Sequence, residues 1–177
     1  MTTTGSVPID YHQFGVADFA VTRFPSAVGP MGLVSVAVGG AVIYTGIAAG
    51  FVSVSVDVRS EPPVVVDDPW EEIIEVSLDE APIPVDPRAS ILGGIRGSDR
   101  RAFRIVGLLS GVEGFPVLNP AGGPCRLRVH ARGRDRNWDG VDKEPREEYL
   151  LVAWPAPLSD EVIHKPLLGI FQAMQEL

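Results

Sequence analysis

An all-β fold is the fold class that this sequence predicts, in the form of an antiparallel, jelly-roll-like β-sandwich with a short C-terminal helix. The chain of 177 residues contains 19 glycines and 16 prolines, which favour turns and interrupt helices. Several short stretches alternate apolar and polar residues with the period of two that marks a half-buried strand. About eight or nine such strands separated by turn residues favour a sandwich. The length suits a single domain over residues 1–177.

The N-terminal half is expected to form a short tail and then four strands. Residues 1–6 are interpreted as a flexible tail. The Gly39-Gly40 pair predicts a two-residue hairpin turn between two apolar strands. The clearest strand pattern places four valines on one face, with Phe51, two serines and Asp57 on the other. The expected strands are residues 9–14, 32–38, 41–46 and 51–58.

The C-terminal half is expected to form further strands and the helix. Residues 81–87 contain three prolines, which suits a linker or an edge segment but not a central strand. Residues 160–177 are predicted to be helical, because Leu167, Leu168, Phe171 and Met174 recur at helical spacing. The strands expected here are residues 70–78, 102–109, 114–118, 125–132 and 147–154.

The overall charge and the single cysteine restrict the class of protein. A formal net charge of −8 argues against direct nucleic-acid binding and fits either a soluble protein or one that meets a basic partner. The N-terminus lacks the basic and apolar regions of a signal peptide, and the longest apolar stretch is broken by Gly and Pro, so no membrane segment is expected. One cysteine, Cys125, allows no internal disulfide. A cytoplasmic protein is the simplest prediction; the oligomeric state stays open.

Acidic residues are concentrated in one part of the chain. Residues 57–90 hold ten acids and two bases, a local balance of −8. One interpretation is a solvated turn followed by a charged edge strand that resists unwanted sheet pairing. The other is a surface for a basic partner, with an aromatic anchor among carboxylates. The residues of this predicted partner site are Asp67, Asp68, Trp70, Glu71 and Glu72.

Basic residues are concentrated in another part. Residues 96–136 hold nine bases and three acids, a local balance of +6. Alternation along one strand places Leu127, Val129 and Ala131 on one face. Five cationic or titratable side chains fall on the other face, namely Arg126, Arg128, His130, Arg132 and Arg134. They predict either cross-strand pairing with Glu71, Glu75, Glu147 or Glu148, or an anion-binding face.

The stretch DRNWDG resembles the opening of a calcium-binding loop. Such a loop needs oxygen ligands at positions 1, 3 and 5, Gly at position 6 and Glu at position 12. Here position 12 is Arg146, and both flanks are predicted strands rather than helices. The polar tip of a long hairpin is therefore the favoured interpretation, with calcium as the alternative. The candidate ligands are Asp135, Asn137, Asp139 and Asp142.

No catalytic residue is assigned, and a non-enzymatic protein without a cofactor is expected. The sequence contains no G-x-S-x-G, H-E-x-x-H, phosphate-loop or dinucleotide motif. Cys125 and His130 lie five residues apart on one predicted strand, about 16 Å, which is too far for a nucleophile and its base. A pair between Cys125 and His12 stays open at this level.

The run IDYHQFGVAD, from Ile9 to Asp18, resembles the opening of the competence protein J family, the inhibitors of DNA-entry nucleases. The specific match covers Tyr11, His12, Gln13 and Phe14. The strand FVSVSVDV and the closing YLLVAWPAP are similar in arrangement. The resemblance implies an acidic inhibitor or immunity-type protein that binds a nuclease or another basic partner. The alternative is a calcium- or anion-binding β-protein that uses residues 135–147 or the face from Arg126 to Arg134.

Overall fold

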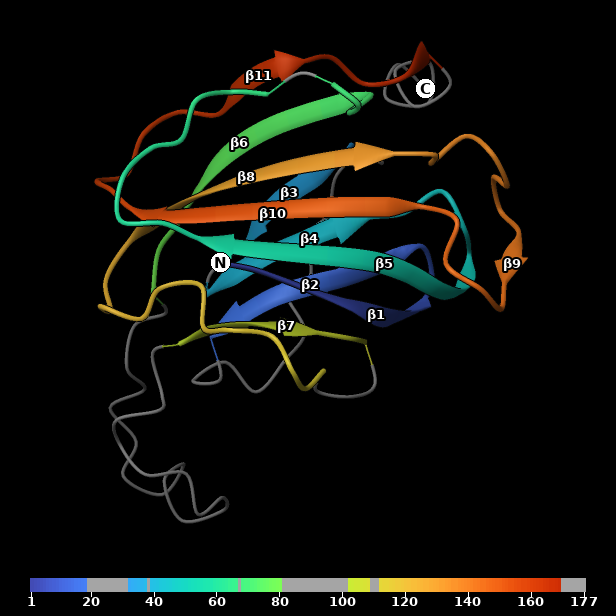
Figure 1. Ribbon diagram of the computed structural model, residues 1–177, viewed down its shortest axis with the longest axis horizontal. Coiled ribbons are helices and arrows are strands. Elements are labelled where there is room, and N and C mark those ends of the chain that lie inside the picture. The colour runs from blue at the N-terminus through green and yellow to red at the C-terminus, as the bar shows by residue number, and fades with distance from the viewer. Residues whose placement is uncertain (19–31, 38, 67, 81–101, 109–111, 170–177) are drawn as a thin grey trace.

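The computed structural model describes residues 1–18, 32–37, 39–66, 68–80, 102–108 and 112–169. These residues form strands β1 Thr2–Asp10, β2 Gln13–Asp18, β3 Val34–Ala37, β4 Gly40–Tyr44, β5 Ala49–Val58, β6 Glu72–Leu78, β7 Phe103–Val106, β8 Cys125–Arg132, β9 Val141–Asp142, β10 Glu148–Pro155 and β11 Val162–Lys165. All eleven belong to one mixed sheet, which curls into a half-barrel (Figure 1). The all-β prediction is confirmed.

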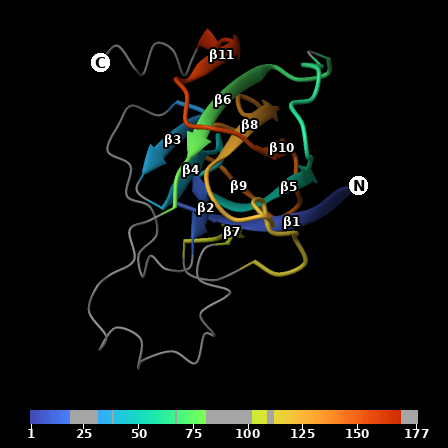
Figure 2. The ribbon, with the colours of Figure 1, turned by 90° about the vertical axis from the view of Figure 1, so that its left-hand side faces the viewer.

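The predicted sandwich is wrong, because hydrogen bonding continues around the sheet without a break. The strand order is β11-β6-β8-β10-β5-β1-β2-β4-β3, with β7 on β2 and β9 on β5. Strand β10 joins the two halves by pairing antiparallel with β8 and parallel with β5. Strand β3 at one edge of the sheet lies against β6 near the other edge, as the view roughly along the strands shows (Figure 2). Alternation alone cannot distinguish these folds, since both bury one face of each strand.

The N-terminus differs from its prediction in two ways. Residues 2–6, expected to be a tail, extend β1, which pairs with β5 from Thr2 opposite Asp57 to Asp10 opposite Ala49. The strand expected at residues 9–14 is interrupted by a two-residue turn, Tyr11-His12, that separates β1 from β2. A period of two does not show a turn when the turn residues are themselves common in strands.

The C-terminal prediction is also corrected. Residues 162–165 form β11, an antiparallel edge strand on β6, and the described residues contain no helix. The rest of the predicted helix, residues 170–177, and the proline-rich residues 81–87 lie outside the described part. Residues 114–118 are not a strand, although Leu118 is buried and its N–H donates to the carbonyl oxygen of Phe103. No helix long and apolar enough to cross a bilayer occurs in the described residues.

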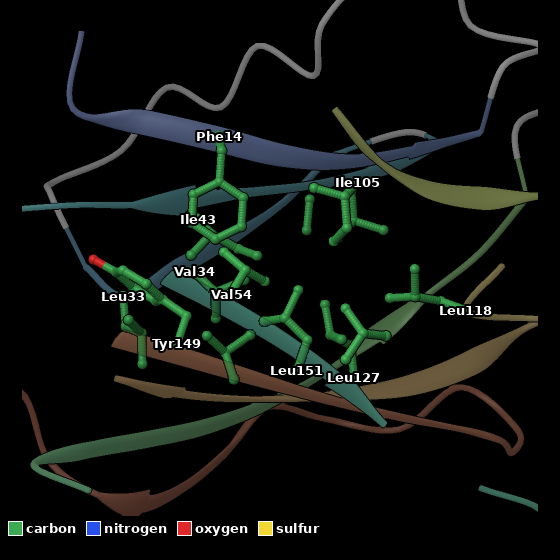
Figure 3. Close-up of a cluster of buried hydrophobic side chains, with 14 of the residues drawn as sticks. Phe14, Leu33, Val34, Ile43, Val54, Ile105, Leu118, Leu127, Tyr149 and Leu151 are labelled. Atoms are coloured by element: carbon green, nitrogen blue, oxygen red, sulfur yellow. The ribbon is translucent and has the colours of Figure 1, made fainter. Parts of the chain in front are cut away.

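The core fills the concave side of the curled sheet (Figure 3). The alternating valines of β5 that the sequence placed on one face, Val52, Val54 and Val56, have no exposed surface. Phe14 packs edge-to-face on Tyr149, with ring centroids 5.3 Å apart. Burying a side chain of this size stabilises the fold by about 1.5–3 kcal/mol. The core fixes β2 against β10, and so positions the turn that precedes Phe14.

Candidate functional site: an aromatic tip

The basic side chains of β8 are paired within the protein. Arg126 and Arg128 both donate through Nε to the Glu75 carboxylate, at 2.9 and 3.0 Å. Arg126 also donates to the carbonyl oxygens of Ser159 and Asp160, and Arg128 to that of Pro63. These bonds are the cross-strand pairing of the first interpretation. An anion would have to compete with acceptors already in place, so the anion-binding face stays a hypothesis without structural support.

Three further members of the predicted basic face have separate environments. Arg132 forms an ion pair with Glu148. His130 is buried, and burial together with the charge of Arg128 lowers its pKa to about 4, so its ring is neutral near pH 7. Arg134 follows Gly133, whose φ of 81° breaks the alternation of the strand. The Arg134 guanidinium pairs with the Glu72 carboxylate at 2.8 Å, and both side chains are fully buried.

The predicted acidic partner site is largely used inside the fold. Glu72 is buried with Arg134, and Glu71 accepts the N–H of Gly133 at 2.6 Å. The ring of Trp70 lies 5.6 Å from that of His130 and has the Arg132 guanidinium over it. Asp68 is exposed, and Asp67 lies outside the described residues. The structure therefore does not bring the four described residues of this site together as one exposed surface.

The four candidate calcium ligands do not form one cluster. Asn137 donates through Nδ2 to Asp142 Oδ1 at 2.9 Å, while Asp139 Oδ1 lies 3.0 Å from Nε2 of His12. Asp135 is exposed to solvent. In the described part of the chain, no three His, Cys, Asp or Glu residues converge as a metal site. The loop is a hairpin tip in this structure, and calcium binding stays a prediction.

This loop packs against the Tyr11-His12 turn, so two motifs distant in sequence meet. We define the aromatic tip as Tyr11, His12, Trp138 and Asp139. The rings of His12 and Trp138 stack with centroids 5.0 Å apart and an interplanar angle of 29°. The two ring nitrogens of His12 face the carbonyl oxygen of Gly46 at 3.2 Å and the Asp139 carboxylate at 3.0 Å. His12 therefore holds the turn and the loop together.

The backbone of the aromatic tip is strained. Tyr11, His12 and Asp139 have φ values of 53°, 59° and 57°, and these are the three positive-φ residues other than glycine among the described residues. A two-residue hairpin turn with both residues left-handed is usually built from Asn and Gly. Each unfavourable conformation costs on the order of 1 kcal/mol or more and persists where surrounding contacts impose it. Such strain concentrates at functional sites.

A buried carboxylate supports the aromatic tip from below. Glu147 accepts the N–H groups of Gly46 and Ile47, at 3.1 and 2.6 Å, and the hydroxyl of Tyr149 at 2.6 Å. Burial raises the pKa of Glu147 and that of Tyr149. A Cβ on Gly46 would lie 1.7 Å from the carbonyl oxygen of Arg134, so only glycine fits there. The segment that accepts His12 is thus fixed by contacts within the fold.

The exposed part of the aromatic tip consists of the Tyr11 ring and the Asp139 carboxylate. Tyr11 has 79% of its surface exposed, and Trp138 is partly buried in the loop. Val141 on β9, which follows this loop, is 67% exposed, and Phe51 on the paired strand β5 is 42% exposed. Tyrosine and tryptophan are the residue types that contribute most to protein interfaces. Tyr11 is thus an exposed aromatic residue on a turn that is held by the hydrogen bonds of His12.

The aromatic tip does not resemble a nucleophilic active site. Among the described residues, neither ring nitrogen of His12 is hydrogen-bonded to a hydroxyl or a thiol. Cys125 begins β8, whereas the tip lies beyond its other end, so the length of β8, about 23 Å, separates them. Burial also raises the pKa of Cys125 to about 12, which keeps the thiol protonated. The Cys125–His12 pair is thereby excluded.

Comparisons with known protein families, with characterised proteins and with solved structures gave no match. The likeness of residues 9–18 to the competence protein J family remains a hypothesis carried by those residues. Its four matching residues form the Tyr11-His12 turn and the first residues of β2.

Proposed function

We propose that this protein is a non-enzymatic binding module whose aromatic tip contacts a basic protein. The exposure of Tyr11 on a turn with two left-handed residues carries the proposal. An exposed aromatic side chain on a residue with a strained backbone stabilises neither the core nor the turn. A partner that covers Tyr11 would bury this exposed ring.

The charge of the chain favours a basic partner. The net charge of −8 attracts cationic surfaces over several ångströms and accelerates encounter at low salt. The carboxylate of Asp139 is exposed at the aromatic tip, and that of Asp135 is exposed in the same loop. Arg136 and Lys143 are exposed in the same loop, so the local surface carries both signs. We therefore assign long-range attraction to the whole chain and the contact energy to the aromatic side chains.

A nuclease is the first basic partner to test. Nucleases bind phosphate through basic clefts, which an acidic protein can occupy in place of the nucleic acid. The run from Tyr11 to Phe14 resembles the nuclease-inhibitor family, and this resemblance supports the same choice. The inhibitor role would need only a stable complex and no chemistry by this chain.

The test is affinity capture from the native cell extract, followed by a DNA-cleavage assay with any captured nuclease. Tyr11→Ala and Trp138→Ala should lose the partner that the wild-type protein retains. Val64→Ala is the matched control, because Val64 is 87% exposed and lies outside the aromatic tip. A partner retained equally by all four proteins would refute the assignment to this surface.

Calcium binding by residues 135–142 is the second candidate, favoured by one observation. Asp142 is 6% exposed, and its Oδ2 has no hydrogen-bond partner. A cation could neutralise this buried oxygen if the neighbouring side chains turned toward it. Melting in calcium and in chelator tests this candidate: a bound ion should raise the melting temperature, whereas identical curves would refute it.

A further inference from the structure

We propose that the half-barrel carries a second binding site, a pocket that takes a small apolar molecule with a terminal carboxylate. The pocket lies where β5 and β10 end and β8 begins, and so at the opposite end of β5 and β8 from the aromatic tip. It is independent of the proposed protein contact.

The pocket has the size and surface of a ligand site. Its volume is about 340 Å³, within the range of small-molecule sites in proteins. Carbon atoms of prolines, Val58 and Ala121 dominate the walls, and Cys125 contributes an uncharged thiol. Its lining residues are Val58, Arg59, Ser60, Asn119, Pro120, Ala121, Gly122, Pro124, Cys125 and Pro155.

One wall of the pocket is fixed by hydrogen bonds. The Asn119 side chain accepts the N–H of Phe103 at 2.8 Å and donates to the carbonyl oxygen of Gly123 at 3.2 Å. The N–H of Gly123 donates in turn to Glu80 at 2.6 Å. Three prolines in the lining, Pro120, Pro124 and Pro155, add stiffness because their φ angles are fixed. A wall held in this way loses little conformational freedom when a ligand binds.

A guanidinium at the rim selects the polar end of the ligand. Arg59 reaches Asp57 Oδ2 through Nε at 2.7 Å and Nη2 at 2.6 Å, while Nη1 forms no hydrogen bond within the described residues. Asp57 balances the charge of Arg59, so selectivity for a carboxylate rests on this remaining donor. A ligand carboxylate would accept a hydrogen bond from Nη1 while its apolar body fills the pocket.

Titration calorimetry with octanoate, octanol and octylamine tests this site. The wild-type protein should bind octanoate about tenfold more tightly than octanol, the difference expected for a hydrogen bond to a charged group, and should bind octylamine least. Arg59→Gln should remove the preference for octanoate over octanol. Ala121→Trp, at an exposed position of the lining, should fill the pocket and abolish binding of all three.

Val64→Ala is the control and should bind as the wild type does. Absence of octanoate binding by the wild-type protein would overturn the proposal, as would an Arg59→Gln protein that keeps the preference. If Ala121→Trp does not fold, Arg59→Gln alone decides, because Arg59 is 54% exposed and its replacement leaves the core intact. The aromatic tip is unchanged in these variants, so partner capture tests the proposed function separately.

Discussion

The charged convex face of β6, β8 and β10 and the aromatic tip differ in how they use their side chains. On the convex face, Arg126 and Arg128 converge on Glu75, and backbone oxygens take further donors. At the aromatic tip, the contacts of His12 hold a strained turn that leaves Tyr11 in solvent. The region richest in charge is therefore structural, whereas exposure and strain coincide where the charge pattern is weak. Substitutions on the convex face should therefore lower stability, whereas substitutions at the aromatic tip should lower partner affinity.

The largest expected effect is loss of the carboxylate at the centre of the convex face. Glu75→Ala leaves the Arg126 and Arg128 guanidiniums buried without their counter-charge. We expect the free energy of unfolding to fall by about 3–5 kcal/mol, as when one partner of a buried pair is removed. Urea denaturation measures the change, and a loss below about 1 kcal/mol would show that the face is not structural.

A second large effect is the acid sensitivity that His130 confers. Its pKa is about 4 when folded and near 6.5 when unfolded, so the unfolded chain binds the additional proton between these values. Stability should therefore fall by about 3 kcal/mol as the pH drops from 6.5 to 4. Urea denaturation at several pH values should show this slope, and His130→Gln should flatten it. An unchanged slope in the variant would contradict this role.

A smaller effect sharpens the comparison at the aromatic tip. Tyr11→Gly relieves the left-handed conformation at φ 53° and removes an exposed ring. We expect the free energy of unfolding to rise by up to about 1 kcal/mol while partner affinity falls at least about tenfold. Gln13→Gly, at the adjacent strand position, serves as the control because it relieves no positive φ. A lower free energy of unfolding for Tyr11→Gly than for the wild type would refute the claim that this turn is strained.

The smallest expected effect concerns the contact between the turn and the loop. Asp139→Asn replaces a carboxylate whose side chain is 71% exposed and faces His12. Exposed pairs contribute little, so we expect a loss of about 0.5 kcal/mol by thermal melting. A loss above about 2 kcal/mol would mean that this pair, rather than Glu147 below it, holds the aromatic tip.

The strands with clear alternation were predictable, and their arrangement was not. Val52, Val54 and Val56 face the core as expected, and β8 and β10 lie at the predicted residues within one position. The choice between sandwich and half-barrel depends on which strands pair across long separations, such as β10 with β5. Strand periodicity contains no information on such pairing.

The candidate site was visible only as two unrelated motifs. The sequence drew attention to Tyr11-His12 through a resemblance and to Asp139 through a calcium pattern. Neither indicated that a bond from His12 to Asp139 joins them across the fold. The positive φ angles were also hidden, because Tyr and His are not typical left-handed turn residues. The sequence offered one signal: each of its three histidines needs a hydrogen-bond partner, and asking for the partner of His12 could have linked the two motifs.

The most direct test of the central claim compares partner affinity for Tyr11→Gly, Glu75→Ala and Val64→Ala with the wild type. Surface plasmon resonance with the captured partner measures it, below the melting temperature of each variant. We predict at least about tenfold weaker binding for Tyr11→Gly and less than about twofold change for the other two. Unchanged binding by Tyr11→Gly would contradict the account, and loss of binding in Glu75→Ala would then move the contact to the convex face.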